Sequence, residues 1–113
     1  MVWLQCPYLG ADVELTDERE HHIRERHPDL PPDLLDRLEQ VLADPDVVRR
    51  SNTFAGAHLF SRWYDDVKGG KHLVIVVAGG TGQSVRKWIV TSYLAWRLGS
   101  GEVVWKRTRD PEG

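Results

Sequence analysis

The sequence has few of the features that mark secreted, membrane or cysteine-based metal proteins. Its 113 residues contain one cysteine, Cys6, so neither an internal disulfide nor a zinc site made of cysteines can form. No apolar run approaches the length that spans a bilayer, and the first ten residues lack the basic start and long apolar stretch of a signal peptide. We therefore expect a cytoplasmic protein that has no contact with a membrane.

Internal repeats, low-complexity segments and signs of a second domain are also missing. The hydrophobic content of 41% and the charged content of 28% are ordinary for a globular protein. A chain of this length can bury one modest core without disulfides or bound metal ions to stabilise it. We expect a single domain over residues 1–113, with its core between about residues 13 and 107.

The two halves of the chain carry opposite charge, although the formal net charge is only −2. Residues 1–48 contain 12 acidic residues and 4 Lys or Arg, whereas residues 49–113 contain 5 acidic residues and 11 Lys or Arg. The basic half predicts a surface that attracts phosphate groups, such as those of a nucleic acid. The alternative is that opposite charges simply spread over an exposed surface.

The order of the predicted elements is helices first and strands afterwards, apart from Val13 to Leu15, which we expect to form a short strand or a lead-in to the first helix. Thr16 is a good N-cap for a helix that Pro28 ends at about His27, and a second helix runs from after Pro32 to about Ala43. Apolar runs between glycine-bearing turns predict strands over residues 47–51, 59–64, 71–78, 88–96 and 102–106. The sequence thus predicts an α+β fold, with two N-terminal helices packed on a four- or five-stranded antiparallel sheet.

The first helix, within LTDEREHHIRERHP (residues 15–28), has an unusually polar buried side. At 100° per residue, Ile23 shares its stripe with Arg19, His22 and Arg26. Since the isoleucine needs burial, this pattern indicates a helix that packs beside a polar cleft. The alternative is that His22 and Arg26 lie at the rim and cover the edge of the core with their stems.

Other chemistries fit the sequence poorly. His22 and His27 are five residues apart, which misaligns them for one metal ion on a regular helix, and no carboxylate or cysteine cluster completes a site. Cys6 has no basic neighbours in its segment that would lower its pKa. The GGTG stretch lacks a lysine in Walker spacing and leads into a strand, so it is a turn and not a phosphate-binding loop.

Five segments in this order resemble a known group of families. LTDEREHHIRERHPDL, LADPDVVRRS, a strand ending in RWY, GGKHLVIVV and IVTSY resemble the phage-associated, nuclease-like families of the BECR fold, named for barnase, EndoU, colicin and RelE. The resemblance covers residues 13–94, whereas the first ten residues and the tail after Trp96 match nothing in these families.

The resemblance implies a toxin-like ribonuclease with its site between the first helix and the sheet. Such an enzyme uses no metal and no cofactor, and it cleaves RNA by attack of the 2′-OH to leave a 2′,3′-cyclic phosphate. A cognate inhibitor protein is a further expected partner. The implied catalytic residues are His22, His27, Arg50 and Thr91, and the expected substrate-binding residues are Arg19, Arg26, Tyr64, Lys71 and Tyr93.

The residue types suit this reaction. Histidine transfers protons near neutral pH, so we expect His22 to do so, with His27 either as its partner or as a cap of the helix C-terminus. Arg50 and Arg26 would bind the phosphate through their planar guanidinium groups. Lys71 is a weaker candidate, because its position on a strand allows its side chain to face solvent.

Strand periodicity places the remaining candidates. Thr91, Tyr93 and Ile89 are expected on one face of their strand, where the two hydroxyl groups would donate hydrogen bonds to a phosphate. Tyr64 or Trp63 would stack a base. We expect the other tryptophans of the basic half, Trp88, Trp96 and Trp105, to pack in the core.

Noncatalytic interpretations remain open. The same fold with a degenerate site would bind RNA or a protein partner, again in association with a phage or mobile element. A third possibility is an accessory protein of a phage particle, which would bind a partner and have no affinity for RNA.

Overall fold

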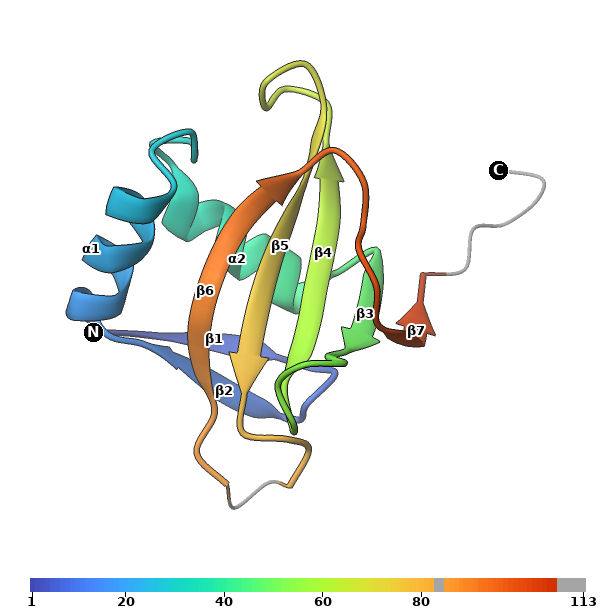
Figure 1. Ribbon diagram of the computed structural model, residues 1–113. Helices are drawn as coiled ribbons and strands as arrows, with labels where there is room; N and C mark the ends of the chain where they lie inside the picture. The colour runs from blue at the N-terminus through green and yellow to red at the C-terminus, as the bar shows by residue number, and fades with distance from the viewer. Residues whose placement is uncertain (83–84, 108–113) are drawn as a thin grey trace.

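The computed structural model describes residues 1–82 and 85–107, which form two helices and one seven-stranded sheet (Figure 1). The elements in chain order are β1 (Val2–Cys6), β2 (Ala11–Leu15), α1 (Asp17–Arg26), α2 (Leu34–Ala43), β3 (Val47–Arg50), β4 (His58–Tyr64), β5 (Lys71–Ala78), β6 (Trp88–Ala95) and β7 (Glu102–Lys106). The strands lie side by side in the order β1-β2-β6-β5-β4-β3-β7.

The expected sheet of four or five antiparallel strands is wrong, because the first fifteen residues add two strands. β1 and β2 form an antiparallel hairpin, and β2 joins β6 through a parallel pairing at Glu14 and Trp88. The hairpin runs across the lower ends of the other strands (Figure 1) and packs against α2. Leu4 and Val13 face each other in this hairpin and are buried, so its apolar alternation completes the core.

The strands that follow α2 agree closely with those predicted from the sequence. β3 to β7 begin and end within one or two residues of the predicted strands, and all pairings among these five strands are antiparallel. β5 is the central strand expected from HLVIVVA, since it pairs along its whole length with both β4 and β6.

Both helices begin and end close to their predicted bounds. The Thr16 hydroxyl accepts a hydrogen bond from the Arg19 backbone N–H at 3.1 Å, which confirms Thr16 as the N-cap of α1. α1 packs beside β6 and buries Ile23, whereas α2 lies behind the sheet and buries an apolar stripe. That stripe consists of Leu34, Leu38, Val41 and Leu42.

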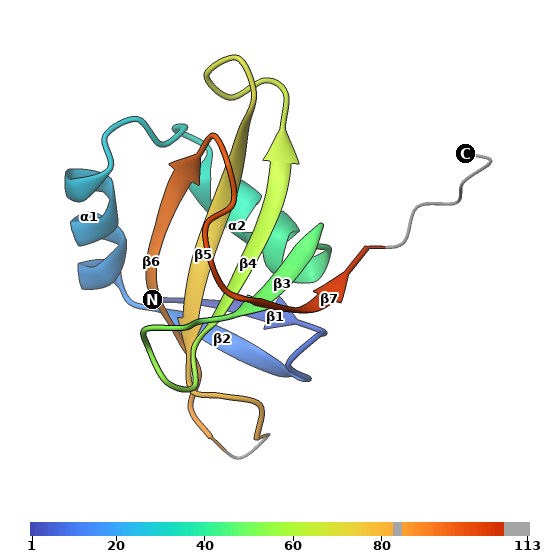
Figure 2. The ribbon, with the colours of Figure 1, turned by 45° about the vertical axis from the view of Figure 1, so that its right-hand side comes forward.

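The two faces of the sheet differ in what covers them. One face packs against α2 and carries Phe60, Leu73 and Ile75, all fully buried. The opposite face, which we call the open face, is turned towards the viewer in Figure 1. Residues 96–101, the crossover segment between β6 and β7, pass in front of it over β5 and β4, as Figure 2 also shows. The rest of this face carries no helix.

A bulge in β6 changes the expected alternation of its side chains. The register between β5 and β6 shifts between Val76 and Val77, so Thr91 lies opposite Val76 while Ile89 lies opposite Val77. Ile89 is therefore buried on the α2 face and does not share the face of Thr91 and Tyr93.

Neither α1 nor α2 is a candidate for crossing a bilayer. Each has ten residues, and no helix within residues 1–82 and 85–107 is both long and apolar enough to span a membrane.

Candidate nucleic-acid interface

The C-terminus of α1 meets β6 on the open face. His27 is the residue that ends the helix, and its backbone N–H donates to the Ile23 carbonyl at 2.9 Å. Its ring lies 6.2 Å from the ring of Tyr93, centroid to centroid, with the two planes tilted by 38°. Thr91 is two residues from Tyr93 on the same face of β6, so the structure brings His27, Tyr93 and Thr91 to one region.

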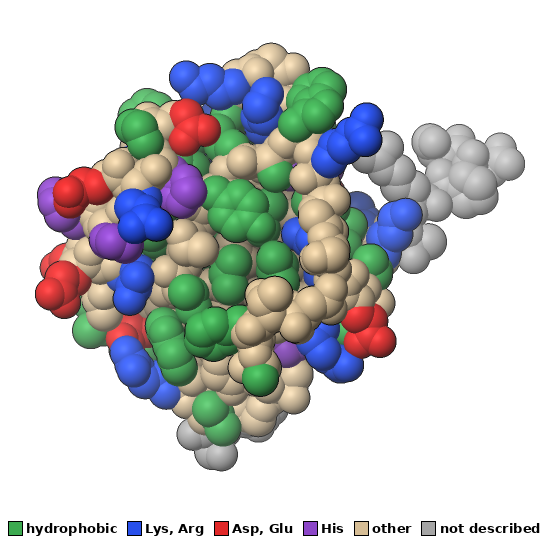
Figure 3. All heavy atoms as spheres, viewed as in Figure 1, with side chains coloured by type: hydrophobic (Ala, Val, Ile, Leu, Met, Phe, Trp, Pro, Cys, Tyr) green, Lys and Arg blue, Asp and Glu red, His purple; other side chains and the backbone are tan. Residues whose placement is uncertain are grey.

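The basic residues of α1 line the side of the helix next to this region. Around the helix axis, Arg19, His22 and Arg26 fall on one side of buried Ile23. All three are exposed, and none of them takes part in a salt bridge with another described residue. Figure 3 shows basic and histidine side chains together along the α1 border of the open face. Phosphate groups can therefore reach these cations.

On the opposite side of α1, the polar side chains pair with one another within the helix. Glu20 and Arg24 form an i, i+4 ion pair at 3.2 Å, and His21 contacts Glu25 at 3.1 Å. The charges of Glu20 and Arg24 are thus already paired within the helix.

His22 does not reach across to the strand. A hollow of about 490 Å³ is lined by α1 and its N-cap, and its walls include Arg19 and His22 together with Thr16, Glu18, His21 and Glu25. Among the described residues, no hydrogen bond joins His22 to Thr91. His27 is therefore the helix imidazole that lies beside the strand residues, and His22 lies further along the helix surface.

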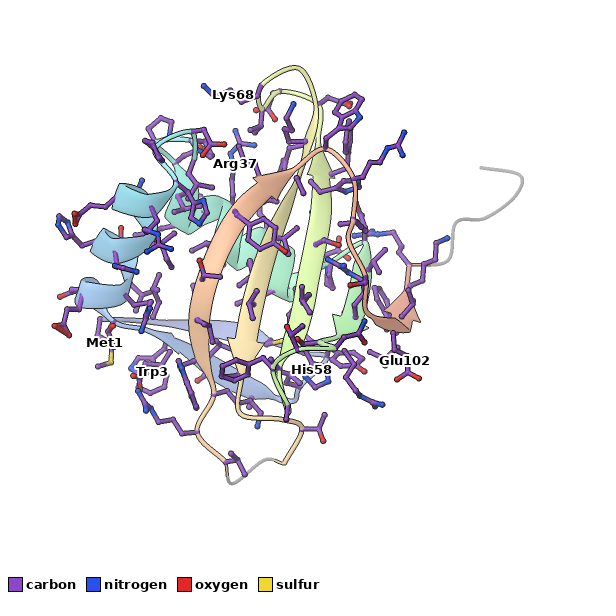
Figure 4. All side chains as sticks on the ribbon, in the orientation of Figure 1. Met1, Trp3, Arg37, His58, Lys68 and Glu102 are labelled. Atoms are coloured by element: carbon purple, nitrogen blue, oxygen red, sulfur yellow. The ribbon has the colours of Figure 1, made fainter. Side chains whose placement is uncertain are left out.

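Arg50 is not brought to this region. Its register partner is His58, which shares the α2 face with Phe60, so the Arg50 side chain emerges on the side of the sheet away from Thr91. Its guanidinium donates to the Glu102 carboxylate at 2.7 Å, at the β7 edge where Figure 4 labels Glu102. The arginine expected to grip phosphate is thus an exposed ion-pair partner of β7.

Arg49, which the sequence did not single out, occupies the open face instead. The pairings place Arg49, Leu59, Val76 and Thr91 in one row across β3, β4, β5 and β6. Arg49 is only 3% exposed, and its Nη1 donates to the carbonyls of Gly99 at 2.8 Å and Ser100 at 3.1 Å. The residue therefore holds the crossover segment against the sheet. Its Nε and Nη2 are buried without a hydrogen-bond partner.

Tyr64 lies on the α2 face and not on the open one. Its hydroxyl forms a 2.8 Å hydrogen bond with the Gln40 side chain of α2, and the Arg37 guanidinium lies 4.8 Å from its ring centre. Burial raises the pKa of Tyr64 above its usual value. Trp63, one residue earlier, is the aromatic side chain of this strand that reaches the open face.

Lys71 and Trp96 meet where β6 passes into the crossover segment. The Lys71 ammonium lies 5.1 Å from the centre of the Trp96 ring, and it donates to the backbone carbonyls of Lys68 and Gly70. The expectation of a core position is wrong for Trp96, which is 63% exposed, and for Trp105, which is 38% exposed.

The alternation of side chains along a strand would have corrected two of these assignments, those of Arg50 and Tyr64. Phe60 and Val48 are the clearest core residues of β4 and β3, and alternation from them places Trp63 and Arg49 on the other face. The exposure of Trp96 has no comparable signal, because it depends on where the crossover segment leaves β6.

Three buried polar groups lie away from the open face, at the hairpin end of the sheet. His58 is 4% exposed, and burial is the main cause that lowers its pKa, with contributions from the charges of Arg50 and Lys87. Burial raises the pKa of the Cys6 thiol, which makes this cysteine a poor nucleophile. Lys87 donates to the carbonyls of Gly82 and Val85.

Metal ligands do not cluster in the described part of the chain. Residues 1–82 and 85–107 contain no group of three His, Cys, Asp or Glu side chains that could hold an ion.

Comparison with family models, with curated proteins and with solved structures finds no match to this chain.

Proposed function

We propose that the protein is a metal-independent ribonuclease whose site lies where α1 borders the open face. The observation that carries the proposal is the contact between His27 of α1 and Tyr93 of β6, with Thr91 on the same face. The unpaired cations of α1 stand next to this contact. The resemblance to BECR-fold nucleases supports the same reaction, since its helix histidines and strand hydroxyls correspond to these residues.

The reaction uses groups that these residues supply. One imidazole takes the proton of a ribose 2′-OH, and the 2′ oxygen then forms a bond to phosphorus while the bond from phosphorus to the 5′ oxygen breaks. An acid returns a proton to that 5′ oxygen. His27 lies beside the ring of Tyr93, and His22 is the second imidazole on this side of the molecule. Arg19 and Arg26 would hold the phosphate oxygens, and the hydroxyls of Thr91 and Tyr93 would donate to them.

Arg50 has no part in this proposal. Its guanidinium is paired with Glu102 on the far side of the sheet. Arg49 is too deeply buried under the crossover segment to reach a substrate directly.

The test is incubation of the purified protein with mixed RNA in excess chelator, followed by analysis of the product ends. We expect 2′,3′-cyclic phosphate ends, with the rate lowered about 100-fold or more in His27→Ala, since general acid–base catalysis contributes about 10²–10⁴-fold. His22→Ala should also lower the rate. His21→Ala is the matched control, because His21 is an exposed imidazole that pairs with Glu25 on the outer side of α1.

Two results would contradict the proposal. Equal rates in wild type, His22→Ala, His27→Ala and His21→Ala would exclude the α1 imidazoles from the chemistry. Tight RNA binding without any product would indicate the noncatalytic binding module.

A further inference from the structure

A second part of the open face carries aromatic side chains that the proposed reaction does not use. Trp63 and Trp96 lie 6.3 Å apart, centroid to centroid, where the crossover segment leaves β6. They are 37% and 63% exposed, although large aromatic side chains are usually buried unless they serve recognition. We call these two residues the tryptophan pair.

The first indole of the pair is held in place by its neighbours. Trp63 Nε1 donates to the Asp65 carboxylate at 2.5 Å, and the ring contacts His72 edge-on at 4.9 Å. Gly70 has a positive φ of 108°, and a Cβ there would come within 2.5 Å of the indole, so the ring packs directly on the glycine backbone. A ring fixed in this way offers its exposed surface at little entropic cost.

Several basic side chains lie near the tryptophan pair, together with the carboxylates of Asp65 and Asp46. Lys71 lies over one side of the Trp96 ring, and Arg97 follows Trp96 in the chain. Lys106 lines a hollow of about 490 Å³ together with Trp63 and His72, and Asp46, Val47 and Arg107 complete its walls. Within the described residues, no salt bridge involves Lys71, Arg97 or Lys106. Figure 3 shows this end of the face as apolar surface bordered by basic side chains.

Exposed aromatic rings beside unpaired cations are the combination that binds single-stranded nucleic acid. Each base has a flat face that stacks on an indole, and each phosphate is attracted to an ammonium or guanidinium. A protein partner would instead favour an apolar patch with few free cations at its centre. The charge around the pair therefore indicates a polyanion with flat bases.

We propose that the tryptophan pair is a base-stacking subsite for single-stranded RNA, with Lys71 and Lys106 beside the phosphates of the bound strand. This inference rests on the proposed function, because it extends the same substrate along the open face. Trp63 is two strands across and two residues along from Tyr93, which is about 12 Å at ordinary strand spacing. A short oligonucleotide would thus span the α1 border and the tryptophan pair together.

The experiment measures binding apart from cleavage. The probe is a fluorescein-labelled 2′-O-methyl RNA hexanucleotide, which cannot be cut by 2′-OH attack, and the readout is fluorescence anisotropy. Trp96→Ala should weaken binding about 5- to 160-fold, which corresponds to the loss of about 1–3 kcal/mol of base stacking on an aromatic ring. Trp3→Ala is the matched control, since Trp3 is 56% exposed and lies on β1, where Figure 4 labels it at the hairpin.

A second pair of variants separates the contribution of charge. Lys71→Gln should weaken binding and reduce its salt dependence, whereas Lys68→Gln should not, because Lys68 lies in the turn before β5 at the top of Figure 4. Trp96 and Lys68 are both exposed, so we expect each variant to keep its fold.

The outcomes distinguish this subsite from the catalytic proposal. If Trp96→Ala weakens binding but no variant or wild type cleaves RNA, the subsite stands and the nuclease proposal fails. If RNA is cleaved while Trp96→Ala and Trp3→Ala bind the probe equally well, the subsite is overturned. Absence of probe binding by wild type overturns it as well. A change of oligomeric state in Trp96→Ala with unchanged probe affinity would assign the pair to protein association.

Discussion

Arg49 and Arg50 are neighbours in the chain whose structural roles differ because a strand turns successive side chains to opposite faces. Arg49 ties the crossover segment to the sheet through two carbonyl groups, whereas Arg50 is exposed and pairs with Glu102. The crossover segment approaches this point through Gly101, where a Cβ would come within 3.1 Å of the Arg50 carbonyl oxygen. The effects of replacing these two arginines on the stability of the protein can therefore be compared directly.

Arg49→Ala should destabilise the protein by about 1–3 kcal/mol, because it leaves two carbonyl acceptors without their donor. Arg50→Ala should change the free energy of unfolding by less than about 0.5 kcal/mol, as is usual for an exposed ion pair. Urea denaturation of both variants measures the difference. Equal stability of the two would contradict the anchoring role of Arg49.

His58 makes stability depend on pH through its buried ring. Its folded-state pKa is lowered, chiefly by burial, so protonation favours the unfolded chain. The stabilising contribution is complete above the unfolded pKa of about 6.5 and is lost as the pH falls towards the folded value.

The urea midpoint should therefore fall between pH 7 and pH 5, and His58→Gln should flatten this dependence. His21→Gln is the control, since that imidazole is exposed on α1. An unchanged slope in His58→Gln would show that other groups, including half-buried His72, whose pKa burial also lowers, carry the effect.

Among the secondary-structure elements, the β1–β2 hairpin is the one that the sequence pattern placed least well. Val13 to Leu15 was expected at most as a short strand, and the first ten residues had no assigned role. Their alternation is short, and the turn between them contains Pro7 and Gly10, so local propensity alone does not pair the two segments. The pairing follows from burial of Leu4 and Val13 in the common core and from the packing of β1 against α2, which are long-range effects.

Leu4→Ala should cost about 2–5 kcal/mol, the usual range for deleting a buried leucine. Trp3→Ala, on the opposite side of the same strand and 56% exposed, should cost much less. Thermal or urea unfolding of both variants tests whether the hairpin is part of the core. A small loss in Leu4→Ala would mean that the hairpin is dispensable.

The later strands and both helices were predictable because their signals are local. Caps, prolines and alternating apolar runs lie within a few residues of the boundaries that they set, as Thr16 does for α1. The composition of the site was less predictable. The alternation of side chains along β3 and β4 decides which face Arg50 and Tyr64 occupy, and the bulge in β6 decides it for Ile89. The exposure of Trp96 depends on the path of the crossover segment.

At the scale of the whole molecule, the charge pattern matters more than the net charge. The acidic half includes α2, whose Arg37 is bound by Asp33 and Asp66, while unpaired cations border the open face. A protein with a formal net charge of −2 can thus present one surface that attracts anionic groups such as phosphates.

RNA binding should weaken as the salt concentration rises, with a slope of about 0.7 in log affinity against log salt for each phosphate contact. Arg26→Gln should lower the slope by about this amount for one contact. Arg24→Gln is the control, because Arg24 is paired with Glu20 on the other side of α1. A slope that neither variant changes would place the phosphate contacts elsewhere.

The central claim is that RNA is cut on the open face by attack of its own 2′-OH. The most direct measurement uses a DNA oligonucleotide that contains a single ribonucleotide, incubated in excess chelator and analysed by mass spectrometry. The account predicts one cut, after the ribonucleotide, with a 2′,3′-cyclic phosphate on the product, and loss of this cut in His27→Ala. An intact oligonucleotide, or cuts at deoxynucleotides, would contradict it.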